Sequence, residues 1–125
     1  VVIVMMFLHT LRVFFQGAYK KPRELNWVVG VLIFFVMLGL GFTGYLLPWD
    51  MKALFATKVG LEIAGSVPLI GGQIKTLLAG DPNIVGAVTL TRFFAIHVFF
   101  LPAALLGLVA AHFMMIRKQG ISGPL

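Results

Sequence analysis

Cysteine is missing from this chain, and charged residues are scarce. Only 11% of the 125 residues are Asp, Glu, Lys or Arg, against roughly 25% in an average soluble domain. The lack of cysteine excludes disulfides, iron–sulfur ligation and covalent c-type haem attachment within this segment. Hydrophobic residues make up 60% of the sequence, and its mean hydropathy is +1.03. The composition therefore indicates a membrane protein, with room for about three or four spans at most.

Two long apolar runs and a shorter one predict about three membrane spans. Residues 25–49 and 93–116 contain no charged side chain, and at about 1.5 Å per residue each run is long enough to cross a bilayer. Residues 1–16 are too short for a full span and predict the second half of a helix. We therefore expect an all-α membrane protein with a single domain over residues 1–125, and an N-terminally truncated fragment.

The segment from Met51 to Val88 is too polar and too rich in Gly and Pro to span a membrane. Its amphipathic pieces, MKALFATKVGLEIAG and PLIGGQIKTLLAG, predict helices lying at the membrane surface. Thr89 or Thr91 is expected to cap the start of the final span.

The net charge of +6 indicates how the protein is oriented in the membrane rather than nucleic-acid binding, because the basic residues lie mostly at the ends of the apolar runs. Short loops rich in Lys and Arg face the cytoplasm. Five residues predict one cytoplasmic side: Lys20, Lys21, Arg23, Arg117 and Lys118. We expect a multi-pass protein of the inner (plasma) membrane, with the thylakoid membrane as an alternative.

The three histidines lie within or beside these apolar runs, where an ionisable side chain is costly and usually functional. His97 and His112 are 15 positions apart, so on one helix they point about 60° apart. Pro102 lies between them and is expected to kink the helix and shift this phase. His9 and His112 both lie near the cytoplasmic ends of their helices. Because imidazole is a common axial ligand of haem iron, we expect these two to bind one haem and His97 to bind a second.

Gly30 and Gly44 are 14 positions apart on the second span, about 40° short of four turns, and share a face. Close helix–helix contact explains such glycines in many membrane proteins. With histidines at a similar separation on a neighbouring span, flat macrocycles packed against the glycines become the better interpretation.

Five segments resemble the cytochrome b/b6 family of quinol–cytochrome c reductases. They are HTLRVFF, YKKPREL, GFTGYLLPWD, TLTRFFAIH and HFMMIRKQGISGPL. The resemblance covers essentially the whole chain and is strongest to the split cytochrome b6 form and the menaquinol reductase subunit of Gram-positive bacteria. It implies a haem-binding transmembrane four-helix bundle, of which this sequence holds the second half of one helix, two further spans and the surface connection.

The resemblance also implies which residues hold two b-type haems. His9 and His112 match the ligands of the haem nearer the inner side. His97 matches one ligand of the outer haem, whose second histidine would lie upstream of this sequence. Gly30 and Gly44 match glycines that make room for the haem planes.

Further matches concern the haem propionates and the quinone sites. Arg12 and Trp27 match groups near the propionates of the inner haem. Arg117 and Lys118 match basic residues near the inner quinone site, where an additional haem is possible in this group. Three positions match the lining of the outer quinol site: Phe42, Tyr45 and Ala56.

By this resemblance, the subunit passes electrons from quinol across the membrane through both haems, coupled to proton translocation. The implied partners are a companion subunit with the remaining cytochrome b helices, a Rieske iron–sulfur protein, a c-type cytochrome, quinone and membrane lipid, in a dimeric complex without nucleic acid. The alternatives are a di-haem membrane anchor of another respiratory oxidoreductase and a scaffold without redox function. The fragment alone is not expected to act as a complete reductase.

Overall fold

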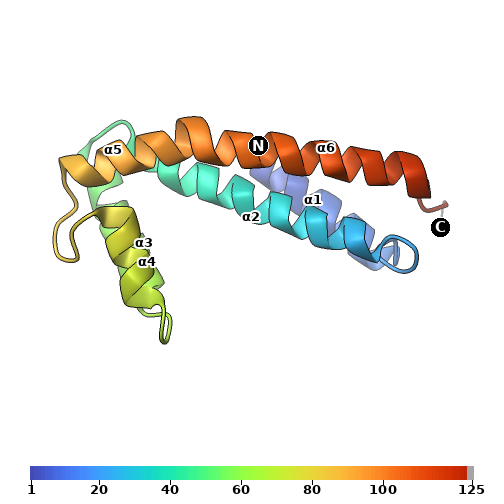
Figure 1. Ribbon diagram of the computed structural model, residues 1–125, viewed down its shortest axis with the longest axis horizontal. Helices are drawn as coiled ribbons and strands as arrows, with labels where there is room; N and C mark the ends of the chain where they lie inside the picture. The colour runs from blue at the N-terminus through green and yellow to red at the C-terminus, as the bar shows by residue number, and fades with distance from the viewer. Residues whose placement is uncertain (124–125) are drawn as a thin grey trace. The chain divides into compact units, whose positions relative to one another are not determined.

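The computed structural model describes residues 1–123, and all regular secondary structure in this part of the chain is helical (Figure 1). The elements in chain order are α1 (Val2–Phe15), α2 (Glu24–Leu46), α3 (Met51–Gly65), α4 (Gly71–Ala79), α5 (Ala87–Ala95), the π-helical turn η1 (Ile96–Phe100) and α6 (Leu101–Gln119). No strand occurs among the described residues. The predicted all-α class is confirmed. The last two residues of the GISGPL tail lie outside the described residues.

Within the part of the chain that the structure describes, two helices are long and apolar enough to cross a membrane. They are Glu24–Leu46 and the continuous run Ala87–Gln119, which contains α5, η1 and α6. Helix α1 is apolar but shorter. These three elements correspond to the two complete spans and the partial span expected from the sequence.

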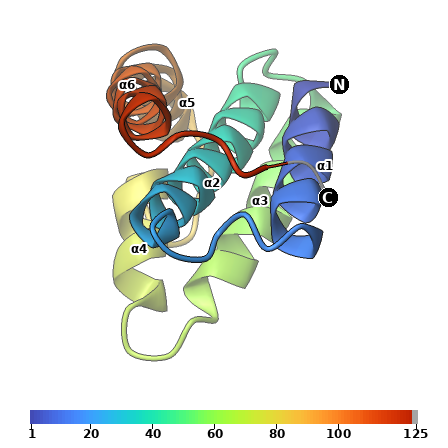
Figure 2. The ribbon, with the colours of Figure 1, turned by 90° about the vertical axis from the view of Figure 1, so that its right-hand side faces the viewer.

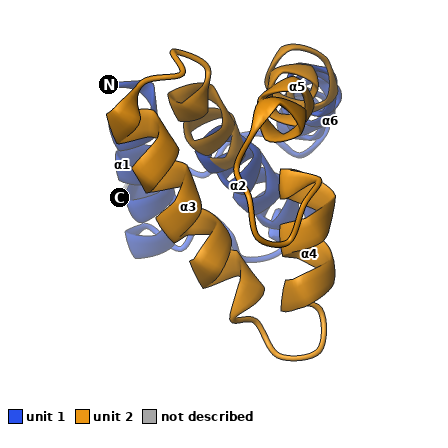
Figure 3. Ribbon diagram, turned by 90° about the vertical axis from the view of Figure 1, so that its left-hand side faces the viewer, with its two compact units in different colours: residues 1–38, 102–125 blue, residues 39–101 orange. Residues whose placement is uncertain are grey.

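Contacts between residues divide the chain into two units, which are described separately (Figure 3). Unit 1 comprises Val1–Leu38 and Pro102–Leu125, and unit 2 comprises Gly39–Leu101. Helix α2 and the last helical run therefore each contribute residues to both units.

Unit 1 contains α1, the first part of α2 and α6. The rings of Phe7 on α1 and Phe34 on α2 lie with their centroids 6.4 Å apart. At the C-terminal end of α6, the tail that follows the helix passes close to the loop between α1 and α2 (Figure 2). Arg23 in that loop donates hydrogen bonds to the carbonyls of Gly120 (3.1 Å) and Ile121 (3.0 Å). The loop is thereby joined to the C-terminal end of α6, whose last carbonyls have no partner within the helix.

Unit 2 has a core in which the surface helices pack against the start of the last helical run. Its buried hydrophobic residues are Leu46, Ala53, Leu61, Ala79 and Phe93. Arg92 on α5 donates hydrogen bonds to the carbonyls of Thr76 (3.3 Å) and Leu77 at the end of α4. Lys75 and Glu62 form an ion pair of 2.6 Å between α4 and α3. This packing and these bonds fix α3, α4 and α5 to one another.

The two expected helices of the connection are both present as α3 and α4. Asp50 caps α3 by accepting a hydrogen bond from the backbone N–H of Ala53 (2.7 Å), as aspartate commonly does at a helix start. Phe55, Val59 and Ile63 form an exposed apolar stripe along α3. This stripe fits a helix lying at a membrane surface, which remains a prediction.

The start of the last helical run differs from the expectation. The helix begins at Ala87, with Gly86 as its N-cap in an extended conformation, rather than at a Thr89 or Thr91 cap. Thr89 instead accepts a hydrogen bond from the Gly86 N–H (3.1 Å) and donates one to the carbonyl of Ala79 (2.7 Å). Thr89 therefore lies inside the first turn, where its hydroxyl bonds to backbone groups of Gly86 and Ala79. The prediction of a threonine N-cap was wrong.

Candidate functional site

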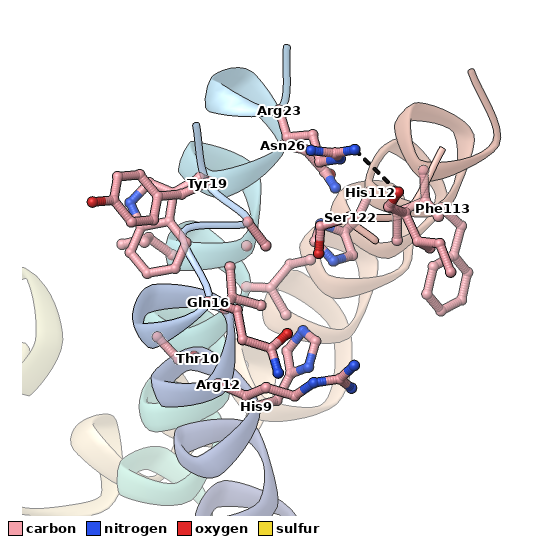
Figure 4. Close-up of a pocket in the computed structure, with 18 of the residues that line it drawn as sticks. His9, Thr10, Arg12, Gln16, Tyr19, Arg23, Asn26, His112, Phe113 and Ser122 are labelled. Atoms are coloured by element: carbon pink, nitrogen blue, oxygen red, sulfur yellow. Dashed lines mark hydrogen bonds between the residues drawn. The ribbon is translucent and has the colours of Figure 1, made fainter. Parts of the chain in front are cut away.

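A cavity of about 550 Å³ lies in unit 1, lined by residues of α1, α2, α6 and their flanking loops (Figure 4). Its volume is within the range of sites that hold small molecules and cofactors. His9 from α1 and His112 from α6 both line it, and Figure 4 shows both imidazoles directed toward the same space. The structure therefore brings together the two histidines that the sequence paired. We call this cavity the His9–His112 site.

Gly30 of α2 lies against His112. A Cβ atom at this glycine would stand 3.4 Å from His112 Cε1, which is van der Waals contact. The backbone of α2 therefore approaches the imidazole about as closely as an alanine side chain would permit. The expectation that Gly30 makes room for a haem plane stays a prediction.

Two buried polar atoms in the lining have no hydrogen-bond partner. They are Oδ1 of Asn26, a residue only 9% exposed, and Nδ1 of His112. A buried polar atom without a partner costs about 1–3 kcal/mol, so such atoms call for a ligand or an explanation. Together with two facing imidazoles, they fit a group with a metal centre and polar substituents, as a haem has.

Arg12 and Trp27, the residues predicted to lie near haem propionates, also line this cavity. Arg23 lines it as well and brings a second guanidinium group, which is partly engaged by the tail carbonyls. Guanidinium groups bind carboxylates strongly. Arg117 is exposed and is outside the lining of the cavity, so the described structure does not place it with the other predicted residues.

His97 lies in unit 2, in the π-helical turn, and packs closely against Gly44. A Cβ at Gly44 would stand 2.6 Å from His97 Cε1 and 3.1 Å from Nδ1. Side chains do not approach each other so closely, so only glycine leaves room for this imidazole in its present position. In each unit a histidine thus lies against one of the two glycines, while the role of these glycines beside haem planes stays a prediction.

Thr43 fixes the orientation of the His97 ring. Its hydroxyl lies 2.8 Å from the carbonyl of Gly39, to which it donates, and 3.2 Å from Nδ1 of His97. Since a hydroxyl has one hydrogen to donate, the threonine oxygen accepts from Nδ1–H. That bond leaves Nε2 as the unprotonated nitrogen, which is the form in which imidazole binds a metal. We call His97, Thr43 and Gly44 the His97 site.

The remaining predicted residues of the quinol lining are in unit 2. Phe42 packs with its ring centroid 5.5 Å from that of Phe93, and its ring also covers Gly60. Tyr45 is 52% exposed, and Ala56 is exposed on α3. The structure places Phe42 beside the core of unit 2 and leaves Tyr45 and Ala56 at its surface, and their role remains a prediction.

Sequence reasoning missed Asn26 and Thr43. Both are polar residues inside an apolar run, and each lies near one of the two glycines that were singled out. Asn26 precedes Gly30 by four positions, which places it on the same helix face. Thr43 directly precedes Gly44. A search for polar residues near these glycines would have found both.

Among the described residues, no group of three or more His, Asp or Glu side chains could hold a bare metal ion. The chain offers paired or single imidazoles instead. This donor set suits an iron whose other four positions are filled by a macrocycle, because only the two axial positions remain for the protein.

Comparisons with known proteins find similar sequences. The chain is 90% identical to the menaquinol:cytochrome c reductase cytochrome b subunit of Bacillus subtilis over 124 residues, which are 99% of this chain and 55% of that protein. It is 49% identical to cytochrome b6 of Synechocystis over 98% of this chain and 55% of that protein. The chain thus spans about half the length of these relatives.

A solved structure described as a hyperthermophilic respiratory Complex III is also similar, with a TM-score of 0.88 and 37% sequence identity over 98% of this chain and 33% of that one. The family described as cytochrome b (N-terminal)/b6/petB matches residues 1–125. The chain therefore belongs to the cytochrome b/b6 family.

Proposed function

We propose that this chain is the haem-binding part of the cytochrome b subunit of a quinol–cytochrome c reductase. In this proposal two b-type haems bind in sequence along its helices. His9 and His112 are the axial ligands of the first haem. His97 is one ligand of the second, whose other ligand is a histidine in the part of the subunit outside this sequence.

One observation carries the proposal. Two imidazoles from different helices face a cavity of about 550 Å³ in which Gly30, Asn26 and a pair of arginine side chains also meet. A packed core histidine would fill its own surroundings and bond to its neighbours. Here Nδ1 of His112 is buried and makes no hydrogen bond of normal geometry with residues 1–123, which supports a ligand-binding role over a packing role.

Each residue has a distinct task in this arrangement. His9 and His112 offer nitrogen lone pairs to the iron. Arg12 and Arg23 provide positive charge and N–H donors for propionates, and the Asn26 amide provides a further polar contact. The apolar helices around them exclude water and keep the local dielectric low, which is one determinant of haem potential.

In the His97 site, Thr43 holds the ring through Nδ1, so that Nε2 would be free to hold a haem iron. Such a hydrogen bond fixes the tautomer and makes the ligand more basic. Gly44 gives the ring the space it needs. A haem iron with both axial positions filled supplies one-electron transfer. The chain's contribution is to hold two such irons in a dry apolar interior.

The finer parts of the proposal follow from family membership and the charge pattern. Electrons from quinol oxidised at the outer face cross the membrane through both haems to a quinone on the inner side, coupled to proton translocation. The partners are the companion cytochrome b subunit, a Rieske protein and a c-type cytochrome in a dimeric complex. In this proposal the Lys20–Arg23 side faces the cytoplasm and the subunit lies in the plasma membrane, which the basic loops support. The exposed apolar helices support contact with lipid and partner subunits.

The test is haem per polypeptide in the full-length subunit, purified from membranes and measured by pyridine haemochrome spectra. We expect two b haems in the unmodified protein and one in each of His9→Ala, His112→Ala and His97→Ala. Met114→Ala is the control, because Met114 is two positions from His112 on the same helix, is 68% exposed and is outside the cavity lining.

Redox titration identifies which haem is lost. His9→Ala and His112→Ala should leave the same haem, with one midpoint potential, and His97→Ala should leave the other. Different residual haems after His9→Ala and His112→Ala would disprove the shared site. An unmodified protein without haem would remove the electron-transfer function altogether.

A further inference from the structure

The two histidines of the last helical run and the two glycines that they face have different spacings. Gly30 and Gly44 are 14 positions apart on α2, while His112 and His97 are 15 positions apart. On regular α-helices, 14 steps end about 40° short of four turns and 15 steps about 60° beyond them. The difference of about 100° would turn one imidazole away from its glycine. Yet His97 lies against Gly44 in unit 2, and His112 lies against Gly30 in unit 1.

The turn η1 accounts for the extra residue. Residues Ile96–Phe100 form a π-helical turn, in which Leu101 donates its N–H to the carbonyl of Ile96, five positions earlier. A single π turn places one additional residue in the helix and leaves the following residues in the register of a helix one residue shorter. The 15 positions from His97 to His112 therefore act as about 14 α-helical steps, which is the spacing of the two glycines.

The position of the π turn follows from Pro102. Proline has no N–H, and its ring clashes with the carbonyl four residues before it in an α-helix, here that of Val98. A wider turn just ahead of Pro102 relieves that clash. Val98, Phe99 and Phe100 are 53%, 67% and 62% exposed. Packing of these side chains within unit 2 therefore does not explain the turn.

We propose that η1 and Pro102 adjust the helical register of His97 relative to His112 for haem binding. They absorb the one residue by which the histidine spacing exceeds the glycine spacing, so that His97 and His112 both meet their glycines. The inference rests on the proposed function, since it is the binding of two haems that requires both imidazoles in register. Pro102 is a positioning residue in this proposal and touches neither haem.

The test removes or adds one residue at the same place in the full-length subunit. Deletion of Phe99 leaves 14 positions between the histidines and removes the need for a π turn. Insertion of one alanine between Phe99 and Phe100 places the histidines 16 positions apart. That spacing is one residue more than a single π turn can accommodate. Phe99→Ala is the matched control for loss of the side chain alone. Haem stoichiometry, midpoint potentials and the low-spin EPR signals of the ferric haems are recorded for each variant.

We expect two haems after deletion of Phe99 and after Phe99→Ala, with both low-spin EPR signals retained. Insertion should reduce the stoichiometry from two haems to one. Loss of either haem on deletion would overturn the inference, and so would retention of both haems on insertion. If the unmodified subunit carries two haems but deletion removes one, the register inference fails while the proposed function stands. Without haem in the unmodified subunit, the proposed function itself fails.

Discussion

The His97 site and the His9–His112 site hold their imidazoles by different means. His97 lies beside the packed core of unit 2, with Gly44 against its ring and Thr43 bonded to Nδ1 at 3.2 Å. His9 and His112 face an open cavity, and Nδ1 of His112 has no protein partner. The His97 imidazole is oriented by contacts within its own unit. The other two are brought near each other but are not fixed.

This difference separates two ways of preparing a metal ligand. A pre-oriented imidazole needs little reorganisation on binding, but it tolerates few changes in its surroundings. A cavity with free polar atoms relies on the cofactor to complete its contacts. Substitutions around His97 should therefore act strongly and locally, and those in unit 1 should act more weakly.

The largest effect is expected from Gly44→Ala. The new Cβ would stand 2.6 Å from His97 Cε1, so the imidazole must move, and its Nε2 would leave the position set by Thr43. We expect loss of the haem bound at the His97 site, from two haems per full-length subunit to one, measured by pyridine haemochrome spectra.

Two glycines serve as controls for Gly44→Ala. A Cβ at Gly107 would meet nothing within 4 Å, and one at Gly30 would reach 3.4 Å from His112. Gly107→Ala should keep both haems, and Gly30→Ala should have an effect between the two. Equal effects at Gly44 and Gly107 would show that an added methyl group on either helix, and not contact with the histidine, decides the outcome.

A smaller effect is expected from Thr43→Val, which keeps the shape of the side chain but removes its hydroxyl. Loss of a hydrogen bond contributing about 1 kcal/mol corresponds to a shift on the order of 40 mV for a one-electron couple. Because the bond makes the ligand more basic, its loss should raise the midpoint potential of the His97-site haem. The potential of the other haem should stay unchanged in the same redox titration, and Thr43→Ser should restore the native value.

The smallest effect is expected from Arg23→Ala. It removes two hydrogen bonds to the carbonyls of Gly120 and Ile121, which are exposed and contribute about 1 kcal/mol in total. Hydrogen exchange at the amides following α6 should become about fivefold faster, with both haems retained. Lys21→Ala, an exposed neighbour in the same loop, is the control. Arg12 still lines the cavity in this variant, so loss of a haem would mean that the propionates need the Arg23 guanidinium as well.

Much of the fold could be predicted from the sequence because apolar length and helix breakers determine it. The bounds of α3 agree with the amphipathic segment MKALFATKVGLEIAG, and α2 ends two residues before Pro48, at Leu46. The pairing of His9 with His112 followed from their depth near the same helix ends. These features depend on local composition or on the geometry of single helices.

Other features depend on contacts between elements and could not be predicted from the sequence. The start of α5 is set by Thr89, which bonds to Ala79 ten positions earlier in the chain. The phase of the last helix depends on a π turn that helical periodicity does not encode, although Pro102 indicated a disturbance. Asn26 and Thr43 became visible only when the cavity and the neighbouring histidine were located.

The bonds between α4 and α5 have a mechanical consequence. Arg92 and Thr89 tie the end of α4 to the first turns of α5, and His97 follows only five residues after Arg92 on the same rod. A tilt of α3 and α4 therefore also tilts the helix that carries His97. A force on α3 and α4 is therefore transmitted to the His97 imidazole.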